Sequence, residues 1–180
     1  MIDLIRGIYS WRIWYMLSTA EIRQRYCRSA IGQFWLTIAM LVNIMALGTV
    51  WSVLFKVPMR EYLPYVAIGI ILWQFLTTLI QDGCNTFIQS EYYMKQVPLP
   101  CSSFVYANVA KQTMIFLHNA VLIPFVLLFG SKLPGLSDVA LFLIGFVLIL
   151  INGIWASLFF GMLCARFRDF PNIVASLMQV

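Results

Sequence analysis

Charged residues are scarce in this chain of 180 residues, where Asp, Glu, Lys and Arg together make up only 11%. Hydrophobic residues make up 62%. A typical soluble domain has about 25% charged and about 45–50% apolar residues. The composition therefore excludes an ordinary soluble domain and indicates an all-α integral membrane protein, built as a polytopic helix bundle. Although the net charge is +5, no basic run interleaved with aromatic residues suggests a nucleic-acid partner, and we expect none.

Motifs for catalysis are also missing. The chain has no G-x-x-x-x-G-K-[ST] loop to cradle a nucleotide, since the segment 130–132 (GSK) lacks the upstream glycine. It has no G-x-S-x-G or H-E-x-x-H motif, and its single histidine has no acidic neighbour in helical register. We therefore expect no catalytic residue and no cofactor in this chain. The apolar runs described next hold no Asp or Glu, which argues against an ion-coupled transporter.

Four apolar runs are long enough to cross a hydrocarbon core of about 30 Å. They predict membrane spans at 34–55, 63–80, 104–129 and 139–163 within one transmembrane domain, 1–180. A polar loop, 81–103, separates the second and third spans. A further apolar run begins at 173 and reaches 180, which is too short to cross a bilayer. We expect it to be the start of a fifth span in a longer natural chain; a tail lying along the surface is the alternative.

The first 30 residues mix arginine with tryptophan and tyrosine, which is typical of a helix lying in the lipid headgroup layer. An ordinary solvated arm is the alternative. This segment holds five arginines, and with Lys95 and the two arginines of 164–172 they give eight basic residues on one side. The opposite side holds three, namely Lys56, Arg60 and Lys132. The positive-inside rule thus predicts a multi-pass protein with a cytoplasmic N-terminus.

The four cysteines then fall on or near the reducing cytoplasmic side, so we expect neither disulfides nor, without C-x-x-C spacing, a metal site.

Polar and aromatic residues inside the spans either face a channel or bond between helices. The candidates for a channel-facing role are Asn43, Trp51, Trp73, Gln74, Asn108, Gln112, His118 and Asn119. Asn108, Gln112 and Asn119 share one helical stripe, which favours a pore or an interface. The two tryptophans could line a conduit for sugars, but belt or core positions are the default. We expect Lys111 to snorkel to the cytoplasmic surface and His118 to be a neutral, hydrogen-bonded core residue.

Three motifs, in order along the chain, resemble those of bacterial polysaccharide-export ABC transporter permeases, the type-2 ABC exporter family. Residues 23–35 (RQRYCRSAIGQFW) are similar to the family's Arg-Tyr-basic-x-Ser-x-Leu-Gly-x-x-Trp, with Ile31 in place of leucine. Residues 94–100 (MKQVPLP) resemble Ile-Lys-Lys-Val-x-Phe-Pro, with Leu99 in place of the aromatic. Residues 165–171 (ARFRDFP) are close to Ala-Arg-Phe-Arg-Asp-Ile.

The resemblance implies a permease subunit with six spans, working as a homodimer in the bacterial inner membrane. It implies export of a lipid-linked polysaccharide (O-antigen, capsule or teichoic acid), driven by two copies of a separate ATPase that binds ATP and Mg. The coupling segment to that ATPase would comprise Glu91, Tyr92, Tyr93, Met94, Lys95, Val97, Pro98 and Pro100. An interfacial gate would comprise Arg23, Arg25, Tyr26, Arg28, Ser29, Gly32 and Trp35. A cytoplasmic cap after the fourth span would comprise Arg166, Arg168 and Asp169.

Two other functions share the same spans. One is the permease of a small-molecule or drug ABC exporter with the same fold. The other is a membrane channel or scaffold that needs no ATPase.

Overall fold

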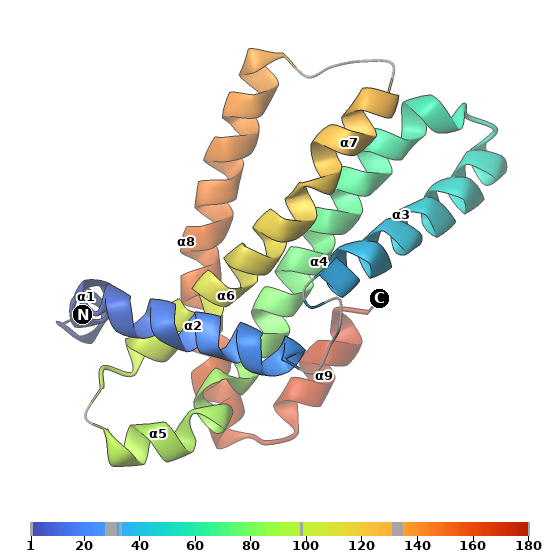
Figure 1. Ribbon diagram of the computed structural model, residues 1–180. Coiled ribbons are helices and arrows are strands. Elements are labelled where there is room, and N and C mark those ends of the chain that lie inside the picture. Colours follow the sequence, from blue (N-terminus) through green and yellow to red (C-terminus); the bar gives the residue numbers. More distant parts are fainter. Residues whose placement is uncertain (1, 28–31, 33, 98, 131–134, 180) are drawn as a thin grey trace.

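The computed structural model describes residues 2–27, 32, 34–97, 99–130 and 135–179, and all its elements within these ranges are helices. In chain order they are α1 (Ile2–Tyr9), α2 (Trp11–Tyr26), α3 (Phe34–Phe55), α4 (Met59–Gln89), α5 (Glu91–Gln96), α6 (Ser102–Ala120), α7 (Leu122–Phe129), α8 (Leu136–Arg166) and α9 (Phe170–Leu177). Figure 1 shows the long helices running together, with α1, α2, α5 and α9 gathered at one end of them. α4 lies at the centre, because it contacts α3, α6, α7 and α8.

Four segments are long and apolar enough to cross a membrane: α3, α4 with α5, α6 with α7, and α8. The expected fold class, an all-α polytopic membrane bundle, is therefore confirmed. α3 has the bounds predicted for the first span. The third span is interrupted at Val121, between α6 and α7. The interruption lies next to Pro124, which has no N–H to donate to the carbonyl of Ala120 four residues earlier.

The structure corrects the predicted loop 81–103, most of which is helical. α4 continues to Gln89, and after a bend at Ser90 the chain forms α5. The polar residues of this segment suggest a loop from the sequence alone. Polar residues do not prevent helix formation, however, when small residues of the same helix can be buried. Gly83 and Cys84 are buried in this extension. α8 and α9 likewise begin before the predicted starts at 139 and 173.

Small residues allow α4 and α8 to approach closely. A Cβ atom added to Gly83 would lie 3.0 Å from the Cα of Ser157, and one added to Gly161 would lie 3.0 Å from the carbonyl oxygen of Gly83. Ser157 is itself completely buried. In lipid, where the tails are as apolar as the side chains, such close packing is the main attraction between helices.

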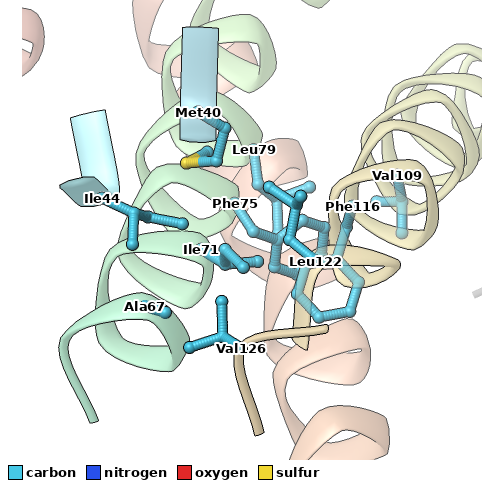
Figure 2. Close-up of a cluster of buried hydrophobic side chains, with 10 residues drawn as sticks. All are labelled: Met40, Ile44, Ala67, Ile71, Phe75, Leu79, Val109, Phe116, Leu122 and Val126. Carbon is cyan, nitrogen blue, oxygen red and sulfur yellow. The ribbon is translucent and has the colours of Figure 1, made fainter. Parts of the chain in front are cut away.

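Ten buried side chains form the apolar core of the bundle. Figure 2 shows them pointing toward one another from α3, α4, α6 and α7. Phe75 and Phe116 meet at its centre with ring centroids 4.9 Å apart, and Phe116 also stacks on Phe146 of α8 at 4.7 Å. This core fixes the spacing of the four long helices, and with it the positions of the polar side chains described below.

The N-terminal helices are fastened to the start of α6. The first N–H groups of a helix have no partner within the helix, and here the Ser102 N–H donates to Asp3 Oδ2 at 3.1 Å. The Ser102 hydroxyl donates to the Asp3 carbonyl oxygen at 2.7 Å. α2 then crosses the long helices (Figure 1) and buries Ser18 and Ile22. It makes most of its contacts with α6.

Candidate functional site

A cavity of about 240 Å³ lies between α3, α4 and α6, with α2 at one end. Most of its lining is apolar, and we call it the polar cavity because amide and guanidinium groups reach it from four helices. Four of the amides predicted to face a channel line it: Asn43 of α3, Gln74 of α4, and Gln112 and Asn119 of α6. Arg25 of α2 lines it as well. These residues come from four helices and lie as many as 94 positions apart in the sequence, so the fold alone brings them together.

The side-chain amides that line this cavity differ in whether they already have hydrogen-bond partners in the protein. Gln112 is buried and its Nε2 donates to Asp82 Oδ2 at 2.7 Å. Asn119 is also buried, and its Oδ1 accepts from the Thr37 hydroxyl at 3.4 Å. Asn43 and Gln74 are exposed to the cavity. Among the described residues, the side-chain amides of Asn43 and Gln74 have no hydrogen-bond partner, so each can bind a hydroxyl group as donor and acceptor.

Beside the cavity, Lys111 sits in an ion-pair cluster. Its Nζ lies 2.9 Å from Glu21 Oε2 of α2 and 2.9 Å from Asp82 Oδ2 of α4. Arg25 approaches the same Asp82 oxygen at 3.8 Å. The Lys111 side chain is 7% exposed, so the expectation that it snorkels to the surface is wrong. Burying a single charge in an apolar region costs free energy. Here two carboxylates within hydrogen-bond distance of Nζ offset that cost.

From the sequence alone, Asp82 falls in a loop and Glu21 in the N-terminal arm, so neither is an evident partner for a residue inside a span. A signal was present nonetheless, because a lysine within a span needs an anionic partner or a route to water.

The remaining channel candidates do not line the polar cavity. Asn108 is buried and donates through Nδ2 to the Leu79 carbonyl at 3.2 Å and the Ser157 hydroxyl at 3.3 Å, so it joins α6 to α4 and α8. His118 packs edge-on against Phe34, and its Nε2 has no hydrogen-bond partner among the described residues. Trp51 stacks on Phe55, and Trp73 is 54% exposed.

α5 presents an exposed surface at the end of the bundle. Tyr92, Tyr93 and Val97 are 67%, 55% and 45% exposed. Lys95 pairs with Glu91 one turn away. Met94 and Pro100 are half-buried; Pro98 lies outside the described residues.

A second cavity, of about 450 Å³, connects α5 to the ion-pair cluster. Tyr93 and Ser90 line it on one side, and Glu21, Arg25 and Lys111 on the other. α5 and the charges that hold α2 to the spans therefore border the same cavity.

The residues of the first motif lie in α2 and in the connection to α3. Arg23 and Arg25 are exposed on the last turns of α2, which ends at Tyr26. Gly32 has a φ of 60°, in the left-handed region that favours glycine. Trp35 opens α3 and is 59% exposed, while Arg28 and Ser29 lie outside the described residues.

The residues of the third motif connect α8 to α9. Arg166 ends α8, and Asp169 directly precedes α9. Arg168 lies between the two helices, and all three side chains are exposed.

The fold and the polar cavity define the class: a multi-pass, all-helical membrane protein with a polar site between its spans. The chain is distantly similar to two O-antigen export system permease proteins named RfbA from Klebsiella pneumoniae. It is 23% identical to one over 171 residues and 25% identical to the other over 175 residues. Each comparison covers 93% of this chain and 64% of the relative, so the chain spans less than two thirds of their length. No family model matches the chain.

Proposed function

We propose that this chain is the membrane-spanning permease subunit of an ABC exporter that moves a lipid-linked polysaccharide across the bacterial inner membrane. The observation that carries the proposal is the convergence of Asn43, Gln74 and Arg25 on one cavity between the spans. Amides that can donate and accept match sugar hydroxyls, and a guanidinium matches the phosphate of a lipid carrier. The distant similarity to O-antigen export permeases supports the same substrate class.

ATP hydrolysis would take place on a separate ATPase subunit, which would bind ATP and Mg, so that this chain itself is not catalytic. Two ATPase copies would serve a homodimer of the permease. The exposed tyrosines and valine of α5 suit docking into such a subunit, because buried aromatic anchors contribute most of the energy at protein interfaces. Glu91 and Lys95 would lie at the rim of that interface.

The excess of basic residues on the segments carrying α2, α5 and the α8–α9 connection supports a cytoplasmic location for that end of the bundle. Arg23, Arg25 and Arg28 would then lie at the level of the lipid phosphates. The cap residues Arg166, Arg168 and Asp169 would lie on the same side.

Export by cells that depend on this permease tests the proposal. Replacing Asn43 and Gln74 together with leucine removes both free amides and should lower surface polysaccharide at least about tenfold, since a site built for hydroxyl groups loses its hydrogen bonds. The lipid-linked glycan should accumulate inside. The measurements are surface glycan by immunodetection and internal glycan by extraction.

Asn152→Leu is the matched control, because Asn152 is exposed on α8 and, among the described residues, its amide bonds only to the Leu148 carbonyl of its own helix. Membrane levels of all variants are compared by immunoblot. Normal polysaccharide export by the double variant would refute the proposed site. Loss of a small molecule's export, with the glycan unaffected, would instead identify a drug exporter, and normal export without any ATPase would identify a channel.

A further inference from the structure

An apolar groove of about 590 Å³ opens between α3, α4 and α7, at the end of the bundle opposite α2 and α5 (Figure 1). Ile44 and Val126 form its buried floor, while Met45 and Phe125 are partly exposed along its walls. Its lining comes from spans of a multi-pass membrane protein, so its natural surroundings are lipid rather than water. No residue that lines the polar cavity also lines the groove, and none of the candidate site residues lines it.

The groove has the length of one membrane leaflet. Arg60 lies in the first turn of α4, and Phe129 is the last residue of α7, so both mark the end of the spans. Ile44 lies 11 residues before the end of α3 at Phe55, which is about 16 Å along the helix axis. That is roughly half of a hydrocarbon core about 30 Å thick. The groove thus runs from the membrane surface to its middle.

Arg60 is the one charged residue among the described residues that line the groove. Its Nε donates to the carbonyl oxygen of Phe129 at 3.0 Å, which fixes the guanidinium at the mouth of the groove. Within the part of the chain that the structure describes, the two terminal nitrogens of the guanidinium have no hydrogen-bond partner and are available to bind an anion. A planar guanidinium with two parallel donors fits a phosphate group.

We propose that this groove is a binding site for a resident bilayer phospholipid. One acyl chain lies along Ile44 and Met45, and the phosphate is held by Arg60. A phospholipid has its charged headgroup at the membrane surface and its acyl chains deeper in the leaflet. The groove follows the same order, with Arg60 at its mouth and apolar walls below. The site does not depend on the proposed export function.

Photo-crosslinking tests the site in the full chain, purified with its natural partners and reconstituted in nanodiscs of phosphatidylethanolamine and phosphatidylglycerol. The probe is a phosphatidylglycerol with a diazirine near the end of one acyl chain. We expect it to label the peptide that contains Ile44 and Met45. Unlabelled phosphatidylglycerol should compete, whereas diacylglycerol, which lacks the phosphate, should not.

Two variants and two controls separate the headgroup contact from the groove. Arg60→Gln should lower labelling about tenfold by removing a charge-assisted hydrogen bond, and Met45→Trp should abolish it by filling the groove. Lys56→Gln changes a cation near the same end that does not line the groove, and Val53→Trp adds the same ring on an exposed face of α3. Both controls should label as the unaltered chain does.

Four results would overturn the proposal. Equal competition by diacylglycerol, or full labelling of Arg60→Gln, would show that the phosphate is not recognised. Full labelling of Met45→Trp would show that the lipid contacts the outer surface only. Absence of labelling in the unaltered chain would show that a second copy, another segment or a lipid-linked carrier fills the groove.

Discussion

Lys111 places a positive charge inside α6, on a side chain that is 7% exposed, and two other helices supply the carboxylates that balance it. Asp82 takes part in three interactions at once, with Lys111, Gln112 and Arg25. The cluster therefore joins α2, α4 and α6 through ionic hydrogen bonds rather than through apolar packing. Removing one member of the cluster leaves the charges of its partners without their counter-ion.

Lys111→Met keeps the length of the side chain and removes its charge. We expect the variant to lose about 2 kcal/mol of stability, less than the about 3–5 kcal/mol for a fully buried pair because Glu21 is half-exposed. The measurement is thermal unfolding of the detergent-solubilised protein. Lys95→Met is the control, since its exposed pair with Glu91 should contribute about 0–1 kcal/mol. Equal losses in both variants would contradict this account of the cluster.

The sequence pattern predicted the stripe of Asn108, Gln112 and Asn119, and all three are indeed buried in the structure. Helical periodicity was enough for that, because residues on one stripe share their surroundings. It was not enough to separate their roles: Asn108 bonds to α4 and α8, whereas Gln112 and Asn119 line the cavity. That difference depends on how the helices are rotated against each other, which no single helix encodes.

At the level of the helices, the close packing of α4 against α8 depends on small residues. Gly83, Ser157 and Gly161 meet where the two helices come closest. Asn108 then reaches the same place from α6, since it donates to the Ser157 hydroxyl. Hydropathy predicted the middle of α4 well, but not its extension to Gln89, because the polar residues of that extension suggested a loop.

Gly83→Ala should destabilise the bundle by about 1–3 kcal/mol, because the new methyl group would lie against the backbone of Ser157. Thermal unfolding in detergent measures the loss. Gly69→Ala is a matched control on the same helix, since a Cβ there meets nothing within 4 Å. That variant should be neutral or slightly more stable, as alanine favours helix. A stable Gly83→Ala variant would mean that α4 and α8 are not in close contact.

For the molecule as a whole, the two ends of the bundle differ. One end carries α1, α2, α5 and α9 together with the charged cluster, and the other carries the apolar groove. From the sequence, the basic residues and the three motifs predicted that the N-terminal segment and the segments 81–103 and 164–172 lie on one side, whereas nothing predicted the groove at the other end. The convergence of the four amides could not be predicted, because it requires the packing angles of three spans.

If α5 docks into an ATPase, Tyr92→Ala with Val97→Ala should lower co-purification of that subunit at least about tenfold, as expected for loss of an aromatic anchor. Pull-down from native membranes, with ATP hydrolysis as a second readout, measures the effect. Tyr65→Ala is the control, because Tyr65 is 72% exposed on α4 away from α5. Unchanged pairing and unchanged ATPase activity in the double variant would exclude α5 as the docking element.

The contact between Asp3 and Ser102 has a consequence for how the protein is made. The two residues are 99 positions apart, and the partners Glu21 and Lys111 are 90 apart. During synthesis the N-terminal helices therefore leave the ribosome long before their binding surface exists. They can take up their final position only after α3 and α4 have been inserted and α6 has begun to emerge. Docking of α1 and α2 is thus a late step of membrane assembly, although these helices are translated first.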